Sequence, residues 1–538
     1  MKNSEAVRLA LKNIMAEGLT DIFPRPFEVD LLNHEKFYNR VRDALIETFN
    51  KIDSTEIKNI KEYGKLLDIL RVHPIQQVLY PKKEAFDYRR CGLIDPLDTL
   101  KYTTLVLSIS REIEKARIPK GKNIVFSYRL QFDENGRIFD SKYNFTSFNN
   151  HTRDQIKKKT VKVLAKCDVA NYYDRLNLHR LESILYSLPV EKKKVKLINE
   201  LLLFWANRDS YGLPVGGNAS RILAEAALIE VDNFLLSHKI RFSRYVDDYR
   251  LYAKDAKQAH YWISLLIERL SLEGLLINQS KTEIRDVAIE KSENKEQAKS
   301  ETKKREVNID KTGKIISGYS GTIPTKFKEA SESEINKIKN SDIQLIINNI
   351  DQAIVIVPEE FKNYCKTLLY NEMWDKFDDF IIVLEKFPQF SPYVVDLLVK
   401  NQEKLPLTVK NKLKNSISNW LISDDYIPEY MCIAFVKLLS SKGYEASEIL
   451  FSFFRSLKRN AGHYIGRATL EGLENLITRG EVLEIRQYYG RADLWEKRQI
   501  IRIVDKNLME AEKQAWFKNI RMNESDEIFT IGTIGNCG

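Results

Sequence analysis

The sequence predicts an α+β protein in which a region of mixed strands and helices is followed by a large all-α domain of helical repeats. Short runs rich in β-branched and aromatic residues, such as 161–168 and 242–252, alternate with longer helical patterns in the first half of the chain. Residues 290–314 are almost wholly polar and carry charges of both signs. Beyond residue 326, one amphipathic helical pattern follows another. At 538 residues the chain is too long for one core, so we expect two or three domains.

Changes in composition place the domain boundaries. Residues 1–290 are predicted as the first domain, beginning with helices up to about residue 70. Residues 291–325 are predicted as a charged linker or an exposed insertion, with glycines that lead to a hinge. Residues 326–538 are predicted as an α-helical repeat domain. Helices of roughly 20 residues each, breaks included, indicate stacked hairpins of HEAT-like type, although no repeated consensus is visible.

The overall charge favours a polyanionic partner. The net charge is +10 and the isoelectric point is near 9.0. The helical pattern at 495–504 has a basic face, which we interpret as solvated rather than as the wall of a nucleic-acid path.

The cysteines and the apolar runs predict a cytoplasmic protein with no membrane partner. Five scattered cysteines without paired spacing indicate a reducing compartment and no zinc site. No apolar run approaches the ~18–20 residues that a membrane span requires. The first residues are too charged to open a signal peptide.

Residues 245–248, Tyr-Val-Asp-Asp, place two adjacent carboxylates at a turn between two β-prone runs. Two like charges side by side are unfavourable unless a positive charge lies beside them. A divalent metal bound by carboxylates and substrate phosphates is the usual answer. An ordinary surface turn is the alternative, because Asp-Asp pairs are common in loops.

A third carboxylate, Asp168, ends a short apolar run, and Tyr173 follows five residues later. A strand that delivers Asp168 beside the Asp-Asp turn would complete a site for two metal ions. In such a site one ion activates the attacking oxygen and the other steadies the leaving phosphate. Taken alone, Asp168 is better explained as a strand-end or helix-cap residue.

Residues 212–221 read Gly-Leu-Pro-Val-Gly-Gly-Asn-Ala-Ser-Arg and open a strongly helical run. Gly216 and Gly217 would allow the backbone to approach a nucleotide or template closely, and Ser220 can cap the helix. The order of acid strand, glycine turn with helix, and Tyr-x-Asp-Asp hairpin resembles the palm of reverse transcriptases. Residues 274–278 with Lys281 resemble the next palm motif.

The resemblance spans roughly residues 85–290 and implies roles for particular residues. It implies that Asp168, Asp247 and Asp248 bind two Mg²⁺ ions, with Mn²⁺ as the alternative. Tyr173 matches the aromatic gate against a sugar 2′-hydroxyl, and Lys281 matches the lysine that protonates departing pyrophosphate.

Two basic and aromatic runs, residues 87–90 and 124–130, are strand-like in pattern and lie where the fingers of a reverse transcriptase are expected. Arg129 is the first candidate for contact with the incoming triphosphate and Arg90 is the second. A solvated strand face is the alternative for each.

The glycine turn narrows the resemblance. Templated reverse transcriptases have Pro-Gln-Gly there, followed by Ser-Pro, whereas here Val215 replaces the glutamine and Arg221 follows Ser220. This string, with Ser243-Arg244 before the later hairpin, resembles the abortive-infection reverse transcriptases of bacteria, the AbiK-like group carried by prophages.

That group implies a template-independent, protein-primed DNA polymerase that defends bacteria against phage. Its substrates would be dNTPs, and its single-stranded DNA product would stay covalently attached to a protein tyrosine. The group also implies a ring-like homo-oligomer. Tyr38, Tyr63 and Tyr80 are N-terminal candidates for priming.

Two other functions remain open. One is an RNA-templated reverse transcriptase, against which Val215 argues. The other is a non-catalytic nucleic-acid-binding scaffold, which would have no need to maintain clustered carboxylates.

Overall fold

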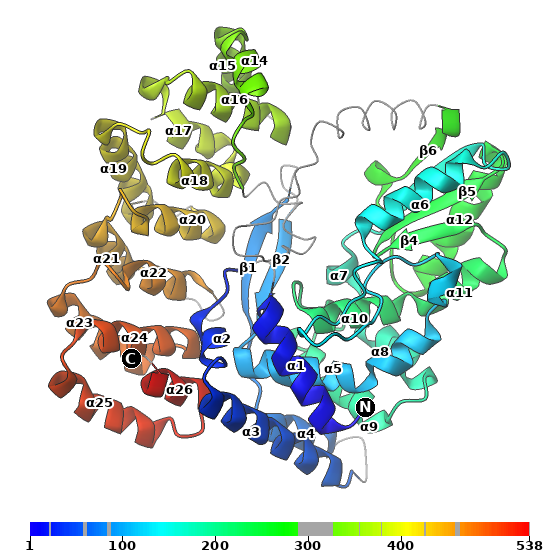
Figure 1. Ribbon diagram of the computed structural model, residues 1–538, viewed down its shortest axis with the longest axis horizontal. Coiled ribbons are helices and arrows are strands. Elements are labelled where there is room, and N and C mark those ends of the chain that lie inside the picture. The colour runs from blue at the N-terminus through cyan, green and yellow to red at the C-terminus, as the bar shows by residue number, and fades with distance from the viewer. Residues whose placement is uncertain are drawn as a thin grey trace. The chain divides into compact units, whose positions relative to one another are not determined.

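The computed structural model describes residues 1–20, 23–57, 62–82, 88–288, 326–353, 356–377, 379–423, 427–457 and 463–536. It divides into two compact units (Figure 1). The first contains residues 1–75 and 93–316, and the second contains residues 76–92 and 317–538. The predicted linker or insertion, 291–325, lies outside the described residues.

The first unit mixes helices with one sheet of four strands. Its helices are α1 (Asn3–Glu17), α2 (Phe27–Leu31), α3 (Glu35–Ser54), α4 (Tyr63–Leu70), α5 (Pro96–Ala116), α6 (Phe145–Lys157), α7 (Tyr172–Arg175), α8 (Leu178–Ser187), α9 (Lys192–Trp205), α10 (Asn218–Ala227), α11 (Ile229–Ser237) and α12 (Ala256–Leu272), with 3-10 turns at Lys120–Lys122 and Gln279–Lys281. Its strands are β3 (Val163–Asp168), β4 (Phe242–Tyr245), β5 (Asp248–Ala253) and β6 (Glu283–Asp286).

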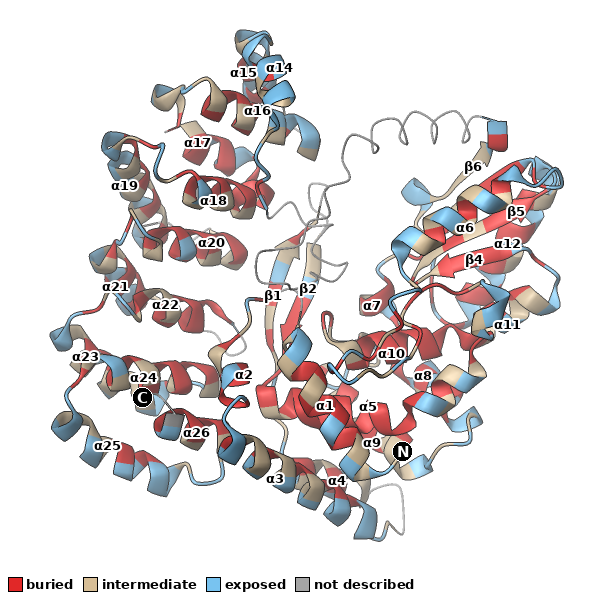
Figure 2. Ribbon diagram, viewed as in Figure 1, coloured by how far each residue is buried: buried red, intermediate tan, exposed pale blue. Residues whose placement is uncertain are grey.

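Helix α5 lies at the centre of the helical part of this unit. It begins where the Asp95 carboxylate accepts the Leu97 N–H, and Pro96 occupies the first turn, where its missing donor costs nothing. Side chains all round the helix are buried, as Figure 2 shows by its red colour. Helices α1, α9 and α10 pack against it, so the predicted N-terminal helical region is confirmed and belongs to this core.

The sheet is antiparallel throughout, with the strand order β4-β5-β3-β6. Because side chains alternate between the two faces of a strand, Leu164 and Asp168 of β3 share one face with their direct partners Tyr252 and Asp248 of β5. Helix α6 covers the far end of this face, where Ile156 packs with Leu164 and Tyr252. The end that carries the two aspartates is only partly buried.

One segment of the first unit differs from the prediction. Residues 124–130, expected as a strand, form two isolated bridges, a parallel one between Val125 and Arg244 and an antiparallel one between Leu130 and Phe139. The segment cannot extend as a strand because Tyr128 adopts a left-handed backbone with φ 44°.

The second unit is almost entirely helical. Its helices are α14 (Glu332–Lys339), α15 (Ile343–Gln352), α16 (Pro358–Tyr370), α17 (Asp379–Lys386), α18 (Ser391–Lys400), α19 (Leu407–Ser423), α20 (Glu429–Ser440), α21 (Ser447–Ser456), α22 (Ile465–Leu473), α23 (Arg479–Tyr488), α24 (Leu494–Asn507), α25 (Glu510–Asn523) and α26 (Ile528–Asn536), with 3-10 turns at Trp374–Lys376, Pro388–Phe390 and Tyr489–Arg491.

These helices pack in an alternating pattern. Helix α18 contacts α20, α20 contacts α22, α22 contacts α24 and α24 contacts α26, while α17 contacts α19 and α19 contacts α21. The all-α prediction is therefore confirmed, and the packing of each helix on the next but one is what stacked hairpins produce. The HEAT-like identity of the repeats stays a prediction.

A hairpin from early in the chain belongs to the second unit. Strands β1 (Gln76–Pro81) and β2 (Tyr88–Leu93) form a two-stranded sheet that packs on α20, where the rings of Tyr88 and Tyr430 lie 6.1 Å apart. The Gln76 amide also donates to the Asp493 carboxylate over 2.7 Å. The sequence placed this segment in the first domain, but its tertiary contacts are with the C-terminal helices.

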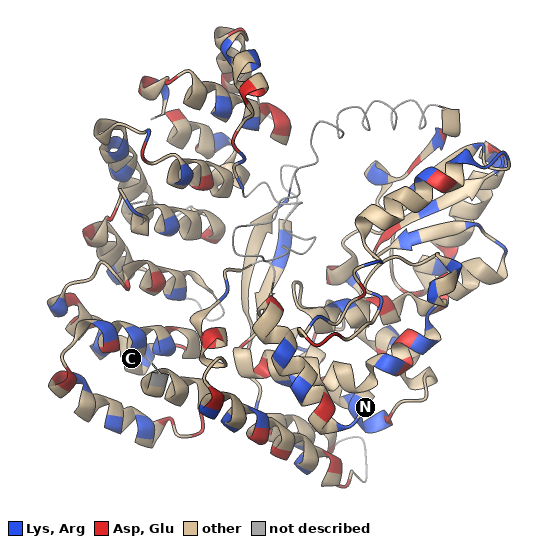
Figure 3. Ribbon diagram, viewed as in Figure 1, with Lys and Arg blue, Asp and Glu red and all other residues tan. Residues whose placement is uncertain are grey.

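The basic residues of α24 are partnered by glutamates from neighbouring helices. Lys497 pairs with Glu524, and Arg502 pairs with Glu474 over 2.8 Å. Figure 3 shows both charge signs interspersed over α23, α24 and α25. Arg498 is almost fully buried and Lys497 is only 20% exposed, so this face is less solvated than the sequence predicted.

Among the described residues, none of the helices combines the length and the apolar character that crossing a membrane would need.

Candidate active site

The sheet brings the three predicted aspartates together. Asp168 ends β3, Asp248 begins β5, and the two are direct cross-strand partners. Asp247 lies in the turn between β4 and β5, and its carbonyl accepts the Val169 N–H over 3.1 Å. A single antiparallel pairing therefore places carboxylates that are 79 residues apart in the chain (168 to 247) at one edge of the sheet.

The turn that carries Asp247 is held in an unfavourable conformation. Val246 has φ 55°, a region that favours glycine and that is rare for a β-branched residue. Such a conformation costs on the order of 1–3 kcal/mol and persists only where the surrounding structure imposes it. Here the Val246 N–H donates to Ser127 Oγ over 2.9 Å and the Arg244 guanidinium donates to the Val246 carbonyl over 2.8 Å.

The carboxylates disturb each other's ionisation. Burial first, and then the charges of Asp168 and Asp248, raise the pKa of Asp247 to about 7. Burial also raises the pKa of Asp248 to about 6, with Asp168 adding to the shift and Arg250 opposing it. Three carboxylates in this arrangement are a donor set that suits a hard divalent cation. A bound cation would relieve the repulsion that raises these pKa values.

A lysine lies beside the three aspartates. The Lys281 ammonium is 3.6 Å from the Asp168 carboxylate and its side chain is half exposed. It follows a short segment in which the Asn278 N–H donates to the Asp168 carbonyl over 2.7 Å. The predicted motif at 274–281 therefore lies against the end of β3, and the lysine remains accessible from solvent.

The glycine turn packs directly against the segment that follows Asp168. The Gly212 N–H donates to the Leu176 carbonyl over 3.0 Å and the Leu213 N–H donates to the Tyr173 carbonyl over 2.9 Å. Gly212 itself adopts φ 100°, where a side chain would be strained. Tyr173, on the short helix α7, is 8% exposed and packs edge-on against Tyr172 at 5.6 Å.

Ser220 does not cap its helix. Helix α10 begins after Gly217, which occupies the N-cap position without a capping side chain. Ser220 lies inside the helix, almost fully buried, with its hydroxyl 3.2 Å from that of Tyr102. The capping prediction is wrong because the helix starts three residues earlier than Ser220 would require. Gly216 is buried, Gly217 is half-buried, and their proposed contact with a nucleotide stays a prediction.

The two arginines that were predicted to contact the triphosphate lie in different places from those expected. Arg129 is 2% exposed, and its guanidinium is held by Glu114 at 2.7 Å and by the Ile118 carbonyl at 2.8 Å. The structure gives Arg129 a structural role, since its guanidinium is itself buried and is held by the half-buried Glu114 carboxylate and a backbone carbonyl. Arg90 is exposed on β2 and belongs to the second unit.

A second acidic group, which no sequence motif indicated, lies in the first unit. Ligand atoms of His73, Asp95 and Asp98 lie within 4.8 Å of one another. The Asp98 carboxylate accepts hydrogen bonds from the Lys101 ammonium at 2.8 Å and the His73 backbone N–H at 2.7 Å. With an ammonium already bound to Asp98 and Asp95 capping α5, this group is better explained as a structural ion pair and helix cap.

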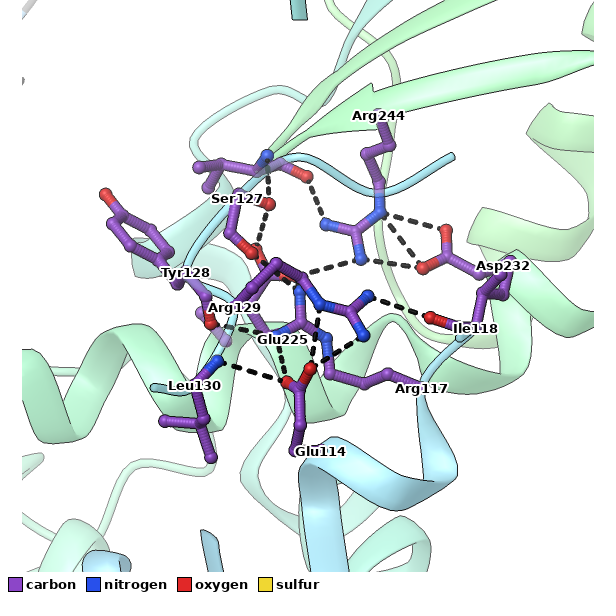
Figure 4. Close-up of polar contacts among 12 residues, drawn as sticks. Glu114, Arg117, Ile118, Ser127, Tyr128, Arg129, Leu130, Glu225, Asp232 and Arg244 are labelled. Atoms are coloured by element: carbon purple, nitrogen blue, oxygen red, sulfur yellow. Dashed lines mark hydrogen bonds and ion pairs between the residues drawn. The ribbon is translucent and has the colours of Figure 1, made fainter. Parts of the chain in front are cut away.

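A buried ionic network lies behind the Asp-Asp turn (Figure 4). Glu225 accepts from Arg117 at 2.6 Å and from Arg244 at 2.9 Å, while Arg244 also donates to Asp232 at 2.6 Å. Burial alone would raise the pKa of Glu225, but Arg244 and Arg117 outweigh it and hold the pKa below its ordinary value. The pairing of these residues carried no recognisable signal in the sequence, because helical and strand periodicity do not record which distant charges pair.

The structure thus brings an acidic hairpin, a third strand-end aspartate and a lysine together at one edge of an antiparallel sheet. Residues 102–308 match the family described as reverse transcriptase (RNA-dependent DNA polymerase). The chain therefore carries a nucleotidyltransferase domain of reverse transcriptase type, and the coarser part of the sequence prediction is confirmed.

Two comparisons with solved structures give low similarity. Telomerase from Candida albicans in complex with a fragment of telomeric RNA has a TM-score of 0.29 and 12% sequence identity, over 88% of this chain and 72% of the telomerase chain. Apo telomerase from Candida tropicalis, truncated from its C-terminal domain, has a TM-score of 0.29 and 14% identity, over 53% of this chain and 72% of that one. No curated protein sequence matches the chain.

Proposed function

We propose that the protein is a DNA polymerase that joins deoxynucleotides without a template and begins synthesis on one of its own side chains, as a bacterial defence against phage. The observation that supports polymerase chemistry is the cluster of Asp168, Asp247 and Asp248 at one sheet edge. These carboxylates would hold two Mg²⁺ ions, which polarise a triphosphate and activate a hydroxyl when bound. Lys281, whose ammonium is 3.6 Å from the Asp168 carboxylate, would give a proton to departing pyrophosphate.

Template independence is supported by Val215. Its side chain is 3% exposed at the position where templated reverse transcriptases carry a glutamine. A buried aliphatic group has no donor or acceptor to offer a template strand.

RNA-templated synthesis is the second candidate, because the matching family is described as RNA-dependent. Incubating the purified protein with dNTPs and Mg²⁺ alone separates the two. A DNA ladder supports the untemplated reaction, and product that requires added RNA supports the templated one. Absence of product under both conditions would leave the nucleic-acid-binding scaffold.

Protein priming predicts that the product DNA remains attached to the polypeptide after boiling in detergent and is removed by nuclease. The physical reason is that without a template no duplex holds a 3′-hydroxyl in place, whereas a fixed side-chain hydroxyl gains a large proximity advantage. Mass spectrometry after nuclease trimming should find a nucleotide on one tyrosine.

The exposed tyrosines are the first positions to inspect. Tyr211 and Tyr261 are 41% and 60% exposed. Burial raises the pKa of Tyr80, which makes its phenol a poorer nucleophile. DNA that separates fully from denatured protein would contradict protein priming. The proposal also includes a cytoplasmic, ring-like homo-oligomer, which light scattering of the full chain would test.

Replacing Tyr173 by Ala should let the enzyme accept ribonucleotides. We expect the preference for dATP over ATP to fall by about tenfold or more, because removal of the ring leaves room for a 2′-hydroxyl. Tyr173→Phe keeps the ring and should keep the preference. The gate role is wrong if the ratio of kcat/KM values for the two nucleotides is the same in Tyr173→Ala and wild type.

A further inference from the structure

Two residues beside the catalytic turn are held in left-handed backbone, and each is fixed by a buried arginine. Val246 has φ 55° and Tyr128 has φ 44°. The Val246 carbonyl accepts from Arg244 at 2.8 Å, and the Tyr128 carbonyl accepts from Arg117 at 2.9 Å. Neither an aromatic nor a β-branched side chain adopts this backbone without external restraint.

The two restraints are joined through one carboxylate. Glu225 accepts from Arg117 at 2.6 Å and from Arg244 at 2.9 Å, and also from the Ser127 hydroxyl at 2.5 Å. That same hydroxyl accepts the Val246 N–H. The polar groups involved are almost completely buried, so water cannot replace them.

We infer that this network is a positioning device for the catalytic turn, with Ser127 as its direct contact to the Val246 N–H. Both backbone polar groups of Val246 are bound by the network, one by Ser127 and one by Arg244. Asp247 follows Val246 immediately, so the backbone conformation of Val246 sets the direction in which the Asp247 carboxylate leaves the turn. Ser127, Arg117, Glu225 and Arg244 therefore act through the turn rather than on the substrate. This inference rests on the proposed polymerase function.

Ser127→Ala tests the inference with little change in volume. We expect kcat for nucleotide incorporation to fall about 10- to 100-fold with KM for dNTP nearly unchanged, because small displacements of a catalytic group cost this much while substrate contacts survive. Ser110→Ala is the matched control, since Ser110 is equally buried and its hydroxyl donates to the Leu107 carbonyl within α5. It should keep the kcat of the wild type.

A second variant separates positioning from general stability. Glycine adopts positive φ without strain, so in a Val246→Gly background the turn needs less restraint. Ser127→Ala should then lower kcat only a few-fold. An equal loss in both backgrounds, or a wild-type kcat for Ser127→Ala alone, would overturn the inference.

Deuterium exchange of peptides covering residues 242–250 gives a readout without activity. Ser127→Ala should accelerate exchange there and Ser110→Ala should not. If the wild type incorporates no nucleotide, the proposed function fails, while this measurement still decides whether Ser127 restrains the turn. Unchanged exchange in Ser127→Ala would overturn the positioning role.

Discussion

Asp247→Asn is expected to abolish nucleotide incorporation, with a loss of about a thousandfold or more, while the metal-free protein becomes more stable at pH 8. One carboxylate of three is lost from the proposed cation site, so a metal ligand is gone, and with it one of the charges whose mutual repulsion destabilises the metal-free protein. Activity assays in Mg²⁺ and urea unfolding without metal measure the two effects on the same samples.

The sign of the stability change follows from the raised pKa. Asp247 has a pKa of about 7 in the folded protein, and an unfolded aspartate titrates near pH 4. The folded state therefore binds the proton more tightly, and stability falls as pH rises between these two values. Asn does not titrate, so the gain in the variant should be on the order of 2 kcal/mol at pH 8, after allowance for partial exposure, and should vanish near pH 4.

Added Mg²⁺ should reverse the order of stabilities. The ion stabilises a folded protein that binds it, so the wild type should gain in melting temperature and Asp247→Asn should gain little. Asp168→Asn should lose activity to a similar extent, and the double variant should lose little more, because both residues serve one site. Near-wild-type rates for Asp247→Asn in Mg²⁺ would refute the assignment of the catalytic centre.

Arg244→Met is expected to destabilise the first unit by about 3–5 kcal/mol, the largest stability effect in this set. Arg244 is fully buried between Asp232 and Glu225, and its removal leaves two carboxylates with reduced compensation. Urea unfolding followed by circular dichroism measures the loss.

The loss of stability in Arg244→Met should depend on pH. Burial already raises the pKa of Asp232 above its ordinary value in the presence of Arg244, and loss of the guanidinium would raise it further. The variant should therefore be less impaired at pH 5, where the carboxyl can be protonated, than at pH 8. Arg208→Met removes an exposed pair with Glu200 in the same unit and should cost no more than about 1 kcal/mol. An equal loss of unfolding free energy in Arg244→Met and Arg208→Met would contradict the structural role of the network.

The three aspartates that lie together at the sheet edge could be singled out from sequence because their signals are local. Asp247 and Asp248 are adjacent, and Asp168 ends an apolar run that β3 confirms as a strand. Amphipathic periodicity likewise indicated the C-terminal helices, since each helix records in its own sequence which face is buried.

The roles of the buried arginines could not be predicted from the sequence around them. Arg129 and Arg244 both lie beside aromatic residues in short apolar runs, and nothing in their neighbours along the chain distinguishes a substrate ligand from a structural cation. The structure makes both of them structural, because Arg129 and Arg244 are themselves buried and pair with Glu114 and Asp232. The partner of a buried charge is chosen by packing between distant elements, as for Arg117 and Glu225, which are 108 residues apart.

The sequence by itself determined the order of the motifs and the change from mixed structure to helices, and it predicted which residues form the site. Only the tertiary structure decided that the hairpin at residues 76–92 packs with the C-terminal helices, and that Val246 adopts a left-handed backbone. The physical reason is the same for both. Local propensity favours neither outcome, and each is stabilised by contacts with residues remote in the chain, Tyr430 and Asp493 for the hairpin and Ser127 for the turn.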